Sequence, residues 1–230
     1  DVTTLDDMIE LLEERYGQAR RIWVFDRGIV SEENLKVLRE RGARYVVGTP
    51  KSMLRKFESE LLEGSWEHAA ESGVEVKTVT HPDAGTDSFI LCRSRQRREK
   101  ERAILRKHAE RLEEKLLAVQ ASVRAGRLRN RATAERRIGR WLGRFTRAED
   151  LFRVELLPAE GPLEDVRIAR RQDVETWAAM AQGAYLLRSN IDGEEPARLW
   201  QWYIQLTQAE AAFRTSKSDL GMRPVFHQKA

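Results

Sequence analysis

The run Arg21-Ile-Trp-Val-Phe25 constrains the fold more than any other segment of the sequence. It is rich in β-forming residues, is too short for a helix and ends at Asp26, so it predicts a buried strand. A second strand is predicted over residues 45–47, and a helix is predicted before each strand, over 5–16 and 31–42. The order helix–strand–helix–strand is typical of an α/β sheet with parallel neighbouring strands.

The rest of the chain predicts further strands and helices. Residues 74–79 alternate as a half-buried strand does, and 88–93 form the expected antiparallel partner. The other predicted elements are a helix over 51–62, a long helix over 95–125, a basic helix over 133–145, a strand over 151–157, a partly helical stretch over 163–180, a strand over 184–188 and a final helix over 196–220.

Charge is distributed unevenly along the chain. Residues 93–147 contain 19 lysines and arginines but only 6 aspartates and glutamates, a local charge of +13, against +4 for the whole chain. Such a basic block is typical either of contact with phosphate, most commonly that of nucleic acid, or of a solvated helical hairpin with ion pairs at four-residue spacing. The sequence leaves both interpretations open.

Composition excludes several classes of protein. The single cysteine, Cys92, rules out an internal disulfide and a cysteine-ligated zinc site. No stretch approaches the ~18 apolar residues of a transmembrane helix, and the N-terminal residues do not resemble a signal peptide. The expectation is a soluble cytoplasmic protein with no membrane contact.

The final helix carries a stripe of polar residues beside an apolar seam. Tyr203, Glu210 and Lys217 are seven residues apart and therefore lie nearly in line, with Arg214 close to the same face. This arrangement is suited to presenting a carboxylate to a metal while cations hold phosphate. It is equally typical of an ion-paired surface, because Glu210 and Arg214 are at the favourable i,i+4 spacing. The apolar seam, expected to pack on the core, consists of Trp202, Leu206, Ala209, Phe213 and Leu220.

Asp26 follows the first strand directly. Open α/β sheets bind ligands at the carboxyl ends of their strands, and Gly28 allows close approach of the backbone there. The alternative is an ordinary turn aspartate.

Two segments together resemble a known family. Trp23-Val-Phe-Asp-Arg-Gly-Ile-Val-Ser-Glu-Glu-Asn34 resembles the stretch around the second catalytic aspartate of DDE transposases from bacterial insertion sequences. Residues 203–217 are similar to their Tyr-x2-Arg-x3-Glu-x6-Lys signature, with Leu206 in place of the arginine. Phe213 and Arg214 match the subgroup pattern Glu-x2-Phe-Arg-x2-Lys. The likeness also includes Tyr45-Val-Val-Gly-Thr-Pro50 and Gly183-Ala-Tyr-Leu-Leu-Arg188.

The resemblance implies a ribonuclease-H-like α/β fold, a mixed sheet flanked by helices, truncated at both ends and lacking its first strands. It divides the chain into a partial core over 1–50, a helix-rich α+β insertion over 51–182 that contains the basic helices, and a returning strand with the catalytic helix over 183–230. The missing strands would leave an unpaired sheet edge at residues 22–25 and 45–47.

The resemblance also implies the site. Three carboxylates bind two Mg²⁺ or Mn²⁺ ions in this family; Asp26 would be the second and Glu210 the third, both catalytic, while the first has no counterpart here. Tyr203, Arg214 and Lys217 would contact DNA phosphate. The partners implied are transposon-end and target DNA, with a homodimer on paired ends. With two carboxylates of three, we expect this polypeptide alone not to cleave DNA.

Two other functions remain as alternatives. One is a non-catalytic DNA-binding remnant of a transposase, in which the basic helices hold phosphate without chemistry. The other is a haloacid-dehalogenase-like phosphatase with Asp26 as nucleophile. That class needs a second aspartate two residues further on, where this chain has Gly28.

Overall fold

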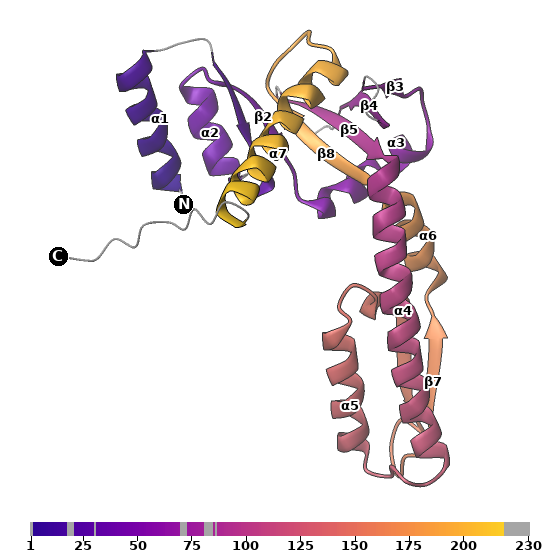
Figure 1. Ribbon diagram of the computed structural model, residues 1–230. Helices are drawn as coiled ribbons and strands as arrows, with labels where there is room; N and C mark the ends of the chain where they lie inside the picture. Colours follow the sequence, from indigo (N-terminus) through magenta and orange to yellow (C-terminus); the bar gives the residue numbers. More distant parts are fainter. Residues whose placement is uncertain are drawn as a thin grey trace, which may run out of the picture. The chain divides into compact units, whose positions relative to one another are not determined.

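The computed structural model describes residues 2–17, 21–29, 31–69, 73–80, 85 and 87–218. The chain forms two compact units (Figure 1). The first consists of residues 1–94 and 184–230, and the second of Arg95–Gly183. The second unit is therefore inserted between two strands of the first.

The first unit contains a six-stranded mixed sheet in the order β1-β2-β8-β5-β4-β3. Its strands are β1 (Ile22–Phe25), β2 (Arg44–Gly48), β3 (Glu67–His68), β4 (Val74–Val79), β5 (Ser88–Ser94) and β8 (Ala184–Ser189). β1 and β2 are parallel, as the sequence predicts, and every other neighbouring pair is antiparallel. The α/β class and the mixed sheet are thus confirmed.

Helices cover both faces of this sheet. They are α1 (Val2–Tyr16), α2 (Glu32–Glu40), α3 (Glu58–Leu62) and α7 (Pro196–Ser218), with 3₁₀ turns η1 (Arg27–Ile29) and η2 (Lys51–Phe57). Alternation along β2 separates the two layers, because successive side chains of a strand point to opposite faces. Tyr45 and Val47 pack with α1 and α2, whereas Val46 packs with α7.

Local sequence signals explain where these helices begin and end. Ser31 caps α2 by accepting a hydrogen bond at its side-chain Oγ from the backbone N–H of Asn34 (3.1 Å). Just after the helix, Gly42 takes the left-handed conformation with φ of 65°. Leu35 and Leu38, three residues apart, form the buried face.

The second unit is built around one long helix. It contains α4 (Arg95–Arg124), α5 (Arg131–Arg144), η5 (Glu149–Leu151), the antiparallel pair β6 (Phe152–Leu157) and β7 (Asp165–Arg170), and α6 (Gln172–Ala181). Leu112, Leu116 and Val119 of α4 are buried against Ile138 of α5 and Val166 of β7. This core is separate from those of the first unit.

Two sequence predictions need correction. The insertion is predicted to begin at residue 51, but residues 51–94 belong to the first unit because β4 and β5 extend the sheet next to β8. The stretch 163–180 is partly helical, as the sequence predicts: α6 covers its second half, and residues 165–170 pair with β6 as a strand. An open edge was expected at both 22–25 and 45–47; β1 is at the edge, but β2 lies between β1 and β8.

Among the helices that the structure describes, none is both long enough and apolar enough to cross a membrane.

Candidate active site

Asp26 lies at the carboxyl end of β1, and its side chain is exposed. Phe25 pairs in register with Val47, so the next residues along, Asp26 and Gly48, come at the ends of two parallel strands. The carboxyl edge of a parallel pair is the place where open α/β sheets bind ligands. The structure therefore places Asp26 where the sequence predicts it.

Helix α7 brings Tyr203 to the same edge. The Oη of Tyr203 donates a long hydrogen bond to Oδ1 of Asp26 (3.4 Å), a contact between residues 177 positions apart in the chain. The same hydroxyl packs on Gly48: a Cβ at that position would lie 2.7 Å from Tyr203 Oη. Gly48 thus leaves the space that allows the phenol to reach Asp26.

The first turns of α7 are firmly anchored in the core. Leu199 and Trp200 are buried, and the indole Nε1 of Trp200 donates a hydrogen bond to the Oη of Tyr185 in β8 (2.6 Å). Trp202, Tyr203 and Ile204 pack partly buried against the same cluster. These contacts fix the direction in which the rest of the helix runs from the sheet.

The second half of α7 is exposed. Glu210 lies seven residues beyond Tyr203, which is about 10 Å along a helix, and both Glu210 and Arg214 are open to solvent. The described contacts join Asp26 to Tyr203 but not to Glu210. The predicted seam packs only at its start, because Ala209 is exposed and Phe213 is 68% exposed. The side chain of Lys217, and Leu220 altogether, lie outside the described part of the chain.

A metal site requires several converging ligands. Asp26 and Glu210 offer carboxylate oxygens, which suit Mg²⁺. Within the described ranges, however, no group of three or more histidine, cysteine, aspartate or glutamate side chains is placed to hold a metal ion. The described residues therefore do not form a complete two-metal site.

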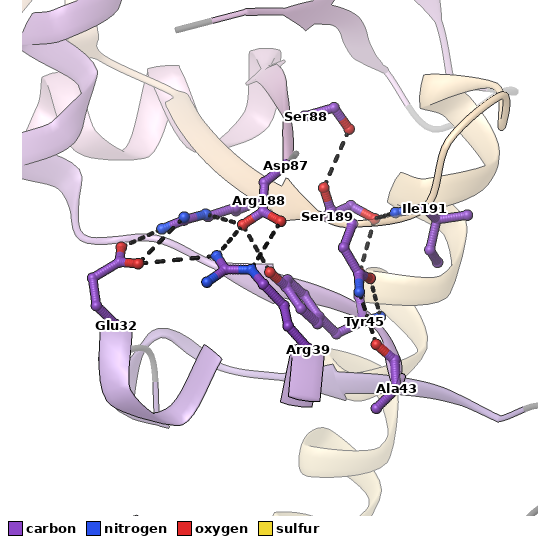
Figure 2. A network of polar contacts seen from close by, with 10 residues as sticks. Glu32, Arg39, Ala43, Tyr45, Asp87, Ser88, Arg188, Ser189 and Ile191 are labelled. Carbon is purple, nitrogen blue, oxygen red and sulfur yellow. Dashed lines mark hydrogen bonds and ion pairs between the residues drawn. The ribbon is translucent and has the colours of Figure 1, made fainter. Parts of the chain in front are cut away.

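A second polar cluster lies within the sheet, around the buried carboxylate of Asp87 (Figure 2). Its Oδ2 accepts hydrogen bonds from Arg39 Nη2 (2.6 Å), Tyr45 Oη (2.7 Å) and Arg188 Nε (2.6 Å). Arg188 also pairs with Glu32 of α2. The network therefore ties α2 and strands β2 and β8 to the residue that precedes β5.

These contacts determine the ionisation of the cluster. Burial by itself would raise the pKa of Asp87, but hydrogen bonds from Arg39 and Tyr45 and the charge of Arg188 hold it below its ordinary value. Burial, and then the hydrogen bond to Asp87, raises the pKa of Tyr45. Asp87 is therefore a carboxylate and Tyr45 a neutral phenol at neutral pH, which is the arrangement of a structural anchor.

Neighbouring side chains fasten β2 beside β8. The side-chain Oδ1 of Asn190 accepts a hydrogen bond from the backbone N–H of Tyr45 (2.8 Å), and its Nδ2 donates to the carbonyl of Ala43 (2.8 Å). Ser189 Oγ donates to the carbonyl of Tyr45 (2.8 Å). The start of β2 is thereby fixed beside β8.

Sequence reasoning did not single out Asp87 or Asn190. The signal was Arg188, a cation at the end of the apolar run Ala184-Tyr-Leu-Leu187, because a buried arginine requires a carboxylate partner. Strand pairing decides which carboxylate becomes this partner. β8 pairs with β5 in a register that places Arg188 opposite Phe89, two residues after Asp87.

The chain was compared with known proteins at three levels. No protein-family model, no curated protein and no solved structure matches it.

Proposed function

We propose that the first unit is part of a DNA strand-transfer domain of the DDE transposase type. In this proposal Asp26 and Glu210 supply two of the carboxylates, and Tyr203, Arg214 and Lys217 bind DNA phosphate near them. The observation that carries the proposal is the meeting of Asp26 with Tyr203 at the carboxyl edge of β1 and β2. The resemblance predicts that the segments around Asp26 and Tyr203 come together, and this contact between residues 177 positions apart supports the proposal.

The residues at this edge have separate tasks in the proposal. The exposed carboxylate of Asp26 is available to a hard divalent cation, and the Tyr203 hydroxyl keeps it oriented. The exposed second half of α7 leaves Glu210 and Arg214 accessible to a nucleic-acid backbone.

The incomplete donor set limits what this polypeptide does alone. Because the described residues do not bring three carboxylates together, we expect it to bind DNA without cutting it. The same observation favours the second candidate function, a non-catalytic DNA-binding protein derived from a transposase. The two candidates differ in whether Asp26 interacts with a divalent metal.

The discriminating experiment is a Mn²⁺ titration followed by NMR. If the proposal is right, millimolar Mn²⁺ broadens the amide signals of Phe25 and Arg27, which flank Asp26, and Asp26→Asn abolishes the broadening. Asp192→Asn, which changes an exposed aspartate elsewhere in the first unit, serves as the matched control and leaves it unchanged. Broadening that is absent, or that survives in Asp26→Asn, contradicts the metal-binding role and leaves the non-catalytic candidate.

A cleavage assay tests the remaining claim. Labelled duplex DNA is incubated with the 230-residue chain and Mg²⁺, and the products are separated on a denaturing gel. We expect intact DNA. Cleavage that requires Mg²⁺ and is lost in Asp26→Asn would show that the chain completes its own active site and would refute the expectation of inactivity.

A further inference from the structure

The basic block of the second unit divides into two helices that use their arginines differently. On α4, several arginines form ion pairs one turn away, between Arg95 and Glu99 (3.4 Å), Arg97 and Glu101 (2.9 Å), and Arg106 and Glu110 (3.8 Å). Arg124 is held by Asp165 of β7 (2.8 Å). Much of the positive charge of α4 is therefore neutralised within the unit.

Helix α5 and its flanks have almost no acidic residues to pair with. Residues 127–147 contain eight arginines and one glutamate, Glu135. Arg136, Arg137, Arg140 and Arg147 are exposed, and among the residues that the structure describes none forms an ion pair or hydrogen bond with them. This part of the unit keeps its charge available.

The exposed arginines form a row. Arg136, Arg140 and Arg144 are four residues apart, so they lie along one face of α5. Arg147 follows in the turn just beyond the end of the helix. The opposite face packs into the core through Ala134, Ile138 and Phe145. Arg144 also lies over the ring of Trp141, 6.0 Å from its centroid. The core contacts thus fix the row in an outward orientation.

Two glycines lie beside this row of arginines on the surface of α5. Gly139 and Gly143 lie in the interior of α5, where each glycine costs about 1 kcal/mol relative to alanine. A Cβ at either position would meet nothing within 4 Å, so no neighbour in the described structure requires glycine there. A polymer lying against the arginines would be able to approach the helix backbone at these two positions.

We propose that the outward face of α5, formed by Arg136, Arg140, Arg144 and Arg147 beside Gly139 and Gly143, binds the phosphate backbone of duplex DNA. Within α5, the stretch from Arg136 to Arg144 spans about 12 Å of helix, which matches roughly three to four phosphates of one strand at 3.4 Å per phosphate along the duplex axis. Guanidinium groups suit phosphate because they donate several hydrogen bonds in a planar fork. This surface is independent of Asp26 and of any metal.

The same face indicates a duplex rather than a single strand. Proteins that bind single strands stack the bases on exposed aromatic side chains. The exposed positions of α5 carry arginine, glycine, alanine and one glutamate, and its aromatic residue, Trp141, is partly buried against the core. A row of cations with no exposed aromatic side chain suits a regularly charged duplex backbone.

The test compares two triple variants of the full chain that remove the same charge. Arg136→Gln, Arg140→Gln and Arg147→Gln together remove three members of the row. Arg95→Gln, Arg97→Gln and Arg106→Gln together form the control, because those arginines are paired with glutamates on α4. Fluorescence anisotropy measures binding of a labelled duplex over a range of KCl concentrations, and circular dichroism verifies that both variants fold.

The expected result is a change in the salt dependence of the α5 variant alone. Loss of three phosphate contacts lowers the slope of log K against log[KCl] by about 2.7 and weakens binding about tenfold or more, whereas the control stays close to the parent chain. The binding assay is run with EDTA and without divalent metal, so a failure of the metal proposal leaves this result unaffected. An unchanged slope in the α5 variant, or an equal loss in the control, overturns the proposal.

Two further arms identify a different occupant. Tighter binding of a single strand of the same length, lost in the α5 variant, would reassign the surface to single-stranded nucleic acid and overturn the duplex proposal. Binding of phosphatidylserine-containing vesicles that depends on the row, with duplex binding independent of it, would also overturn the proposal and reassign the row to anionic lipid.

Discussion

Asp87 is the residue of the first unit whose replacement we expect to be most informative about stability. Asparagine keeps its size but removes the charge, and it turns an amide NH₂ toward donors that need an acceptor. Arg188 and Tyr45 are the donors that cannot turn to water, because the Arg188 side chain is 7% exposed and Tyr45 is buried. Arg39 is 30% exposed and can be rehydrated, so its loss contributes less.

The magnitude follows from these exposures. Each buried hydrogen bond to a charged group contributes about 1.5 kcal/mol or more, so two of them give about 3 kcal/mol for Asp87→Asn, near the lower end for breaking a buried ion pair. The control is Asp165→Asn, which weakens a bidentate arginine pair (2.8 and 2.9 Å) that is partly open to solvent, with Arg124 59% and Asp165 32% exposed. That change should cost less than about 1 kcal/mol, because water screens and replaces the contact.

Urea unfolding followed by hydrogen exchange and mass spectrometry measures the free energy of unfolding of both variants, because peptides from β8 and β7 report on the two units separately.

The stability that Asp87 contributes should also depend on pH. The folded pKa of Asp87 lies below its ordinary value, so its stabilising contribution is fully present above about pH 4 and is lost as the pH falls through the folded pKa. The difference between the parent and Asp87→Asn should therefore be constant from neutral pH down to about pH 5 and shrink below about pH 4.

The refuting result is a similar cost for the two substitutions. If Asp87→Asn costs no more than Asp165→Asn, or if its cost does not change on acidification, the cluster is not held together by a desolvated carboxylate.

Two further predictions concern glycines. Gly48→Ala should displace Tyr203 from the sheet edge and destabilise the first unit by about 1–3 kcal/mol. Tyr203→Phe should cost less than about 1 kcal/mol, because the hydrogen bond it removes is long. Urea unfolding measured on peptides from β1 and β2 tests this difference, and equal costs would contradict it. Gly139→Ala should stabilise the second unit by about 1 kcal/mol, because Gly139 lies inside a helix with open space around it. Gly126→Ala should destabilise the same unit, because Gly126 has a positive φ of 69°. Melting temperatures that shift in the same direction in both variants would refute this prediction.

The helices and strands of the first unit were largely predictable because their signals are local. Ser31 and Gly42 bound one helix, and the short apolar runs at β1 and β2 are too brief for anything but strands. Residues 165–170 were missed although Val166 and Ile168 alternate with polar neighbours. In a stretch of six residues, one such alternation does not distinguish a strand from a helix. Pairing with β6 is what makes this segment a strand.

The candidate site divides in the same way. The sequence by itself determined that a carboxylate follows a strand at Asp26, that Tyr203, Glu210 and Arg214 share one side of the last helix, and that positive charge gathers in residues 93–147. These are properties of spacing along one element, which the periods of helix and strand fix.

Only the tertiary structure decided which of these groups meet and which stay apart. Tyr203 reaches Asp26 because Gly48 leaves room and the core contacts of α7 aim the helix at the strand ends, while Glu210 lies two turns beyond. Several arginines of α4 form ion pairs, whereas the described contacts include none for Arg136, Arg137 and Arg140 of α5, although both helices are basic. The physical reason is that contacts between distant segments depend on packing and strand order, which no local period encodes.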